Sequence, residues 1–184
     1  MSSALLFLSD GFEEVEALTV VDLLRRARID IYTVSITDSL QVTGRSRITV
    51  TADKMWDEIN PELADILILP GGMPGTTYLG KHEGLRKQLL KAASDGRMLA
   101  AICAAPSVFG ELGLLEGKNA CCYPGMETSL KGAEVVFDKK TVKDGKIITS
   151  RGAGTAISFA LRIIHALEGE DVSDEIKKSI VYMD

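Results

Sequence analysis

A cysteine stands where a predicted strand turns into a predicted helix, in the stretch MLAAICAAPSVFGELG of residues 98–113. The apolar run ends at Cys103, and a helical pattern begins at Pro106. Small residues, Ala101 and Ala105, flank the thiol two positions away on either side. Nucleophile elbows share this spacing, because a larger side chain would collide with the strand that has just ended. The pattern predicts that Cys103 is reactive, with an inert core cysteine as the alternative.

Glu16 is a second residue with chemical potential, because it lies on the apolar stripe of a predicted helix. The apolar members of that stripe, four, seven, eight and eleven positions further on, are Val20, Leu23, Leu24 and Ala27. Glutamate is seldom buried without a partner. Either Glu16 caps loop amides or extends to solvent at the helix end, or it reaches the crevice beside Cys103. We favour the second arrangement, in which a neutral carboxyl donates a hydrogen bond to a thiolate.

Backbone amides are the third expected component of the site. Gly71 and Gly72 end another predicted strand, and Ala104 directly follows the cysteine. Because the glycines have no side chains to cover their N–H groups, the three amides are expected to form an oxyanion hole. The amino end of the following helix also favours an anion, so we expect Cys103 to be a thiolate.

Strands alternate with helices along the chain, which favours an α/β fold with a parallel sheet between helix layers. Buried strands are expected at residues 4–9, 31–36, 65–69, 98–102 and 146–150. Helices are expected at residues 13–28, 77–94, 154–167 and 172–181. Weaker patterns suggest a hairpin or edge strands at 40–51, a further strand at 119–123, and a small hairpin from 134–137 and 141–143. Functional crevices of such sheets lie at the carboxyl ends of the strands, where the candidate residues would meet.

Composition excludes several classes of protein. The 184 residues are expected to form one domain, residues 1–184, and the net charge of -5 argues against nucleic acid or an anionic membrane as the partner. The first residues, MSSALLFLSDGFEE, lack a positively charged segment and lead directly into acidic residues, so a signal peptide is not expected. Three cysteines do not suggest a disulfide framework, so a cytoplasmic location is expected. The adjacent Cys121 and Cys122 are expected to point to opposite faces of a strand. No metal site is predicted.

Four segments in the same order, SDGFEEVEA, LPGG, AAICAAP and TSRGAGTA, resemble the ThiJ/PfpI superfamily, in the branch of the human parkinsonism-associated deglycase and its bacterial relatives. The resemblance implies a flavodoxin-like fold, a homodimer and no cofactor. It further implies that Cys103 is a nucleophilic, oxidation-sensitive elbow cysteine and that Glu16 is its hydrogen-bonding partner.

The same resemblance implies further pocket residues. Gly71, Gly72 and Ala104 fall where amides of the family line the pocket. Arg47 and Arg151 match arginines near that pocket.

Two departures from the family pattern narrow the expected chemistry. Proteases of the wider superfamily carry histidine directly after the cysteine, and Ala104 stands there in this chain, so proteolysis is not expected. Many members of the nearer branch have a histidine in the loop where this chain has Tyr123. Tyrosine donates a hydrogen bond, but with a pKa of about 10 it is a poor base at neutral pH.

These residues predict two functions from different classes. The first is a glyoxalase- or deglycase-type enzyme, in which Cys103 adds to a 2-oxoaldehyde such as methylglyoxal and Glu16 moves a proton to give a hydroxy acid. The second is a redox-sensing, stress-protective protein whose Cys103 is oxidised to sulfinate. A chaperone-like member without turnover is a third alternative. The expected partners are a small carbonyl or an oxidant, and a second copy of the chain.

Overall fold

The computed structural model of the protein describes residues 2–183. Its centre is a seven-stranded sheet with the order β10-β11-β7-β6-β1-β2-β5, in which β10 alone runs antiparallel to its neighbour. The strands are β1 (Ser3–Leu8), β2 (Asp30–Ser35), β5 (Lys54–Met55), β6 (Ile66–Leu69), β7 (Met98–Ile102), β10 (Thr141–Asp144) and β11 (Ile147–Ser150). The central order β2-β1-β6-β7-β11 is the doubly wound, flavodoxin-like arrangement that was predicted.

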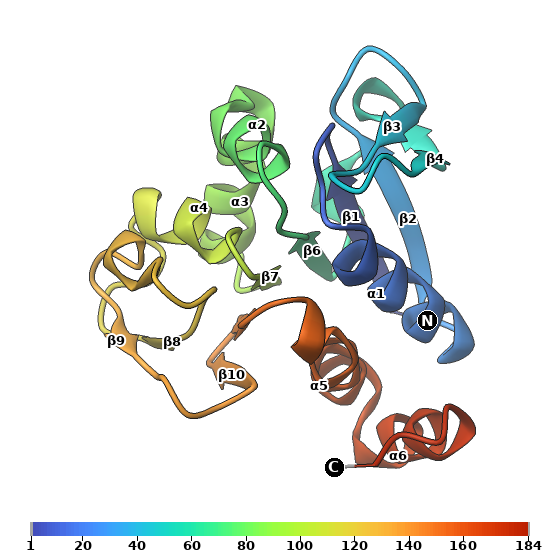
Figure 1. Ribbon diagram of the computed structural model, residues 1–184, viewed down its shortest axis with the longest axis vertical. Coiled ribbons are helices and arrows are strands. Elements are labelled where there is room, and N and C mark those ends of the chain that lie inside the picture. The colour runs from blue at the N-terminus through green and yellow to red at the C-terminus, as the bar shows by residue number, and fades with distance from the viewer. Residues whose placement is uncertain (1, 184) are drawn as a thin grey trace.

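Helices cover the sheet on both faces (Figure 1). α1 and α5 pack together on one face with α6 beside them, and α2, α3 and α4 lie on the other face. The helices are α1 (Glu14–Arg26), α2 (Gly75–Lys81), α3 (Glu83–Ser94), α4 (Pro106–Glu111), α5 (Ala156–Glu168) and α6 (Glu170–Ser179). Short 3₁₀ helices are η1 (Trp56–Glu58), η2 (Pro61–Leu63), η3 (Glu127–Ser129) and η4 (Ala153–Thr155). No helix within residues 2–183 is long and apolar enough to cross a bilayer.

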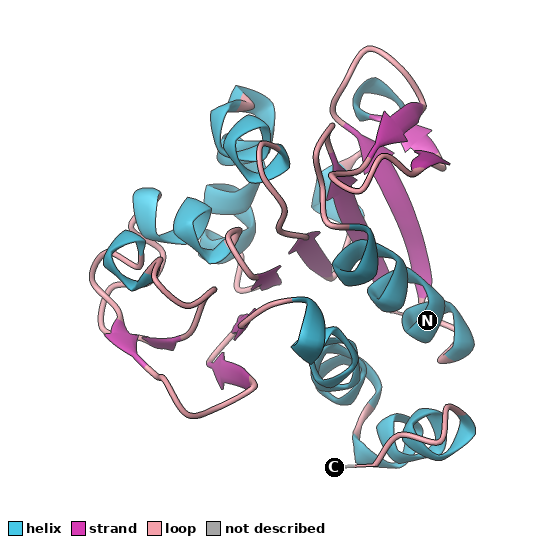
Figure 2. Cartoon of the chain, viewed as in Figure 1, coloured by secondary structure: helices cyan, strands magenta, loops and turns pink. Residues whose placement is uncertain are grey.

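The strands of the sheet lie between the two layers of helices (Figure 2). The central strands β6 and β7 are apolar throughout because they separate two cores. Every residue of β6 and β7 is buried. Along β6, Ile66 and Ile68 join the core beneath α1 and α5, whereas Leu67 and Leu69 join the core beneath α2, α3 and α4. Continuous apolar runs of this length are therefore what a parallel strand buried on both faces requires.

The helix predicted over residues 77–94 is two helices, α2 and α3, that meet at His82. The backbone of His82 is extended (φ -71°, ψ 103°), and its Nδ1 accepts a hydrogen bond from the N–H of Leu85 at 3.0 Å. Its ring packs on Trp56 with the centroids 4.6 Å apart. Burial lowers the pKa of His82, which favours the neutral imidazole that can accept this bond. Periodicity missed the break because Leu79 and Leu85 are both buried, one on each side of it.

Strand partners explain the other differences from the predicted elements. β3 (Gln41–Thr43) and β4 (Thr49–Thr51) form the predicted hairpin. The strand predicted at 119–123 is present but shorter, as β8 (Asn119–Ala120), and it pairs with β9 (Glu134–Val135) outside the main sheet. The predicted small hairpin is wrong, because β9 pairs with β8 and β10 pairs with β11. Local patterns marked the strand-forming residues, but tertiary packing selected their partners.

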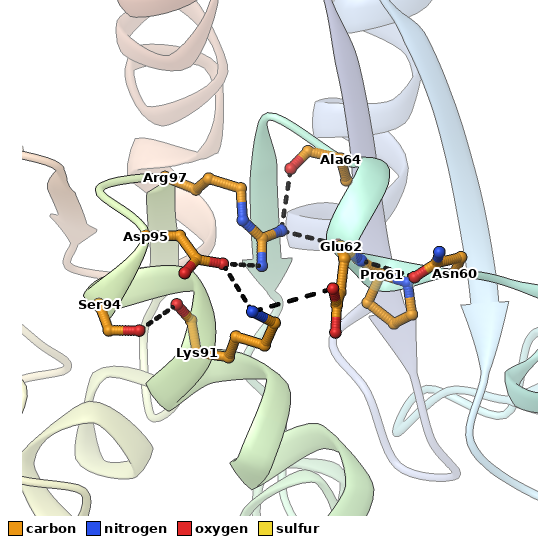
Figure 3. Close-up of polar contacts among 8 residues, drawn as sticks. All are labelled: Asn60, Pro61, Glu62, Ala64, Lys91, Ser94, Asp95 and Arg97. Carbon is orange, nitrogen blue, oxygen red and sulfur yellow. Dashed lines mark hydrogen bonds and ion pairs between the residues drawn. The ribbon is translucent and has the colours of Figure 1, made fainter.

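Arg97 joins the segments that precede β6 and β7 at the amino edge of the sheet (Figure 3). Its Nη1 donates hydrogen bonds to the carbonyl oxygens of Pro61 at 2.7 Å and Ala64 at 3.0 Å. Its Nη2 lies 3.7 Å from Asp95 Oδ2. These contacts fix the amino ends of two central strands and leave the opposite, carboxyl edge for the candidate site.

Candidate active site

Cys103 occupies the turn between β7 and α4 in a strained conformation. Its φ is +65°, in the left-handed region that residues with a side chain rarely adopt. The backbone on both sides of the α-carbon is anchored: the N–H donates to the Ser150 carbonyl at 3.0 Å, and the carbonyl accepts from the Tyr123 N–H at 2.8 Å. Ala101 and Ala105 are fully buried on either side. The turn is the elbow that the small residues predicted.

Glu16 reaches this turn from α1. It is only 1% exposed, and its Oε2 accepts a hydrogen bond from the N–H of Gly71 at 2.8 Å. The carboxyl group is also hydrogen-bonded to the side chain of Cys103. Its Oε1 has no protein partner among residues 2–183. The fold thus brings together side chains from α1 and the β7–α4 turn with an amide after β6, and Glu16 does not extend to solvent.

Burial raises the pKa values of both Glu16 and Cys103. It raises the pKa of Glu16 to about 7, against the hydrogen bonds from Cys103 and Gly71 that lower it. Burial also raises the pKa of the Cys103 thiol to about 12, and the Glu16 carboxylate acts in the same direction. The amides of Ala104 and Gly72 oppose this rise by donating to the sulfur. A thiolate beside an ionised Glu16 is therefore disfavoured, and the pair carries one negative charge at most near neutral pH. A Cys103 thiolate that accepts a hydrogen bond from a neutral Glu16 stays a prediction.

The amides predicted to form an oxyanion hole divide into two roles. Those of Gly72 and Ala104 donate to Cys103, so they can stabilise a thiolate or an anionic oxygen bonded near it. The Gly71 amide donates to Glu16 instead and is not free for a substrate. Position 71 needs glycine, because a Cβ there would lie 2.6 Å from both Cys103 Cβ and Glu16 Oε2.

Replacing Gly71 by alanine should force Cys103 and Glu16 apart. We expect alkylation of Cys103 by iodoacetamide at neutral pH, followed by intact mass, to slow by about tenfold or more, because a thiolate loses the carboxyl that donates to it. Gly154→Ala is the matched control, since a Cβ at Gly154 meets no atom within 4 Å. Equal rates in the two variants would contradict the steric role of Gly71.

The Tyr123 backbone bonds to Cys103, and Arg151 follows Ser150, which also bonds to Cys103. The side chains of Tyr123 and Arg151 nevertheless face different parts of the molecule. A Cβ built on Gly152 would lie 3.4 Å from the Tyr123 ring and 4.0 Å from Cys103 Sγ, so this ring and the sulfur border the same glycine. The Tyr123 side chain is exposed, as a substrate contact requires. Arg151 donates from Nη1 to the carbonyl of Phe137, which directs this predicted pocket residue toward the β9–β10 segment.

The loop between β3 and β4 supplies an arginine other than the predicted Arg47. Arg47 is exposed, and its backbone N–H donates to the Gly44 carbonyl at 3.0 Å. Arg45, two residues earlier, places Nη1 3.3 Å from Glu13 Oε2, and its charge lowers the pKa of Glu16. In this loop it is therefore Arg45 whose charge acts on the pair.

Glu14 is a buried acid that sequence reasoning placed away from the site. It is 4% exposed, and its Oε1 accepts from the N–H groups of Ser46 at 2.8 Å and Ile48 at 3.3 Å. The helical pattern gave no indication, because Glu14 lies off the apolar stripe and its partners belong to a distant loop. The available signal was the excess of acid at one helix start, with Glu13 and Glu16 as close neighbours.

The remaining cysteines lie in the packed interior. Cys121 and Cys122 are buried free thiols. The N–H of Cys121 donates to Thr149 Oγ1 at 3.0 Å, and its Sγ lies 3.4 Å from the Thr149 carbonyl oxygen. Within residues 2–183, no three His, Cys, Asp or Glu side chains are grouped to hold a metal ion.

The sequence pattern of the DJ-1/PfpI family matches residues 2–166. The chain belongs to the DJ-1/PfpI family. Among solved structures, Drosophila melanogaster DJ-1beta superposes on this DJ-1/PfpI protein with a TM-score of 0.95 and 35% identity, covering 100% of both chains. The resemblance read from the four sequence segments is thereby confirmed, as is the flavodoxin-like fold.

Two further relatives of this DJ-1/PfpI protein differ in length. The Caenorhabditis elegans protein named glutathione-independent glyoxalase DJR-1.2 is 29% identical over 180 residues, which cover 97% of this chain and 95% of the relative. Arabidopsis thaliana DJ-1 homolog B is 37% identical over 172 residues, which cover 93% of this chain but 39% of the plant protein. The family therefore includes a protein named for an enzymatic activity, and this chain matches its length.

Proposed function

We propose that this protein is a cysteine-dependent enzyme that converts 2-oxoaldehydes such as methylglyoxal into hydroxy acids, without a metal, glutathione or another cofactor. The observation that carries the proposal is the hydrogen-bonded Cys103–Glu16 pair at the carboxyl edge of the sheet, in which Glu16 is buried and Cys103 is partly exposed. The name of the nematode relative supports the same reaction class. A cysteine–glutamate pair that holds one proton can supply both a nucleophile and a proton carrier.

In the proposed reaction, Cys103 attacks the aldehyde carbon as a thiolate. A carbon–sulfur bond forms, the carbonyl electrons move to oxygen, and that oxygen takes the proton from Glu16 to give a hemithioacetal. The amides of Gly72 and Ala104, which already donate to the sulfur, lie where a developing oxyanion can be stabilised.

Glu16 then acts as the base that the missing histidine would otherwise provide. Its carboxylate removes the proton from the former aldehyde carbon and returns it to the neighbouring ketone carbon, while the hydroxyl proton of the hemithioacetal passes to the former ketone oxygen. One carbon is oxidised and its neighbour is reduced, so no external oxidant is consumed. Water hydrolyses the resulting thioester, releasing the hydroxy acid and the Cys103 thiol. A pKa of about 7 suits Glu16 to give and take protons at neutral pH.

The direct test incubates purified protein with methylglyoxal in the absence of glutathione and measures lactate. We expect turnover that is abolished when the protein is first treated with iodoacetamide and Cys103 is found alkylated by mass spectrometry. Absence of lactate would refute the enzyme proposal. A Cys103 that is also no more reactive than an ordinary thiol would favour the chaperone-like alternative.

A second candidate function, oxidation sensing, is favoured by the partial exposure of Cys103 together with the amide donors around its sulfur. Two equivalents of peroxide would oxidise the thiolate to sulfinate and leave two of water, and the neutral Glu16 would donate to the product. Intact mass after mild peroxide treatment should show two added oxygens at Cys103. Equal oxidation of Cys121 and Cys122 would argue against a selective sensor.

The assembly and the location are also proposals. Val15 and Leu18 project from α1 with 51% and 40% exposure, which gives a second copy an apolar surface to cover. A homodimer is the proposed assembly, and light scattering tests it. The cytoplasm is the proposed location, consistent with three free cysteines.

A further inference from the structure

We propose that Glu14 is a positioning residue for the Cys103–Glu16 pair: it holds the loop of residues 44–48 so that Arg45 stands against Glu13 beside the pair. This inference rests on the proposed function and deepens it. It gives a role to a buried carboxylate that takes no part in the proposed chemical steps.

Glu14 is the buried anchor of an otherwise exposed loop. One carboxylate oxygen accepts from the N–H groups of Ser46 and Ile48, at 2.8 and 3.3 Å. Residues 45–48 are exposed, so few side-chain contacts hold them. The loop fits closely over the carboxylate at Gly44, where a Cβ would lie 2.3 Å from Glu14 Cδ. The two hydrogen bonds from these amides to the buried Glu14 carboxylate hold the loop more strongly than contacts at the surface, because charge-assisted hydrogen bonds are about twice as strong as neutral ones.

The anchored loop places Arg45 next to the start of α1. The Arg45 N–H donates to the Phe12 carbonyl at 2.8 Å, and its Nη1 lies 3.3 Å from Glu13 Oε2. The N–H of Glu13 in turn donates to the Gly71 carbonyl at 2.9 Å. Since the N–H of Gly71 is bonded to Glu16, short contacts connect the loop to the pair.

Three charged or titratable groups act on Glu16: the Cys103 thiol after β7, Glu13 at the start of α1, and Arg45 in the loop. Glu13 raises the pKa of Glu16, and Arg45 lowers it. If the loop loosens, Arg45 withdraws and the charge of Glu13 is no longer offset. The single negative charge of the Cys103–Glu16 pair is then less favourable, and the pair ionises at a higher pH.

The experiment measures the pH dependence of Cys103 alkylation by iodoacetamide, followed by intact mass, in the full-length protein. Glu14→Ala and Arg45→Ala should each move the midpoint upward by about half a pH unit, a size set by the screening of the half-exposed Arg45. Removing the negative charge of Glu14 would by itself move the midpoint downward, so an upward shift reports the loop. Arg47→Ala is the matched control, in the same exposed loop, and should leave the midpoint unchanged.

Further variants separate positioning from charge. Glu14→Gln keeps an oxygen that can accept from both amides, so its midpoint should lie at or below that of the wild type. Glu14→Asp keeps the negative charge, but its shorter side chain moves the carboxylate away from the two amides. The midpoint of Cys103 alkylation should therefore shift upward in Glu14→Asp as in Glu14→Ala. Glu14→Asp also serves as the test variant if Glu14→Ala does not fold. In an Arg45→Ala background, Glu14→Asp should add no further upward shift, because the two residues act through one route.

The outcomes are distinguishable. An unshifted midpoint in Glu14→Asp, with Arg45→Ala shifted, overturns the positioning role of Glu14. Unshifted midpoints in both overturn the whole inference while leaving the pair intact. A wild-type Cys103 with no midpoint near neutral pH contradicts the proposed function itself.

Discussion

A Cys103→Ser variant should lose methylglyoxal turnover by about a thousandfold or more, with the fold retained. A hydroxyl group in the same place has a far higher pKa and is a weak nucleophile, so the pair can no longer form the covalent adduct. The change is small in volume, and serine tolerates the left-handed φ of +65° no worse than cysteine does. Lactate formation without glutathione is the measurement.

The matched control for this variant is Cys121→Ser, the same substitution at a buried free cysteine. A hydroxyl there can still donate to the Thr149 carbonyl, which the Cys121 sulfur now contacts at 3.4 Å. Turnover should persist in this control. Comparable activity of Cys103→Ser and the wild type would exclude every covalent step proposed for Cys103.

The second large effect is expected for Glu16→Gln. Proton transfer by a positioned carboxyl contributes about a hundredfold to ten-thousandfold, so turnover should fall by a similar factor. Without an ionisable neighbour, the midpoint for alkylation of Cys103 should no longer follow the pKa of Glu16, about 7, and should move upward to that of the thiol alone, because burial disfavours the thiolate.

The stability of Glu16→Gln should depend less on pH than that of the wild type. The pKa of Glu16 is raised from 4.5 to about 7 by burial, so folding favours its neutral form. The stability that this gives is fully present below 4.5 and is lost as pH rises through about 7. Wild type should therefore lose more thermal stability between about pH 5 and pH 8 than Glu16→Gln, which cannot ionise. An identical loss in both proteins would contradict a buried, titrating Glu16.

Local sequence patterns were sufficient for the strands and the elbow because their physical causes are local. The apolar run of β7 and the alanines around Cys103 each describe the immediate surroundings of the chain. Glu16 was predictable for a similar reason, since three-residue and four-residue helical spacings place it on the buried face of α1. The contact between Glu16 and Cys103 was predictable because the functional crevice of a parallel sheet lies at the carboxyl ends of its strands, where both residues are located.

Other features depended on partners far away in the chain. The break at His82 is stabilised by the ring of Trp56, which no local pattern connects to it. Glu14 is buried by a loop about thirty residues later, and its burial cannot be read from α1 alone. The proton sharing of Glu16 and Cys103 is likewise a property of their contact, so neither residue type by itself indicates how the thiol ionises.

Gly71 accepts a hydrogen bond from Glu13 through its carbonyl and donates one to Glu16 through its N–H. The first turn of α1 and the end of β6 therefore close a hydrogen-bonded ring through a single residue, Gly71. Such a ring constrains insertions: one residue added between Glu13 and Glu16 would rotate the second carboxylate by about 100° and break it. In variants that keep the proton-sharing pair, we therefore expect the spacing between Glu13 and Glu16 and the glycine at position 71 either both to be kept or both to change.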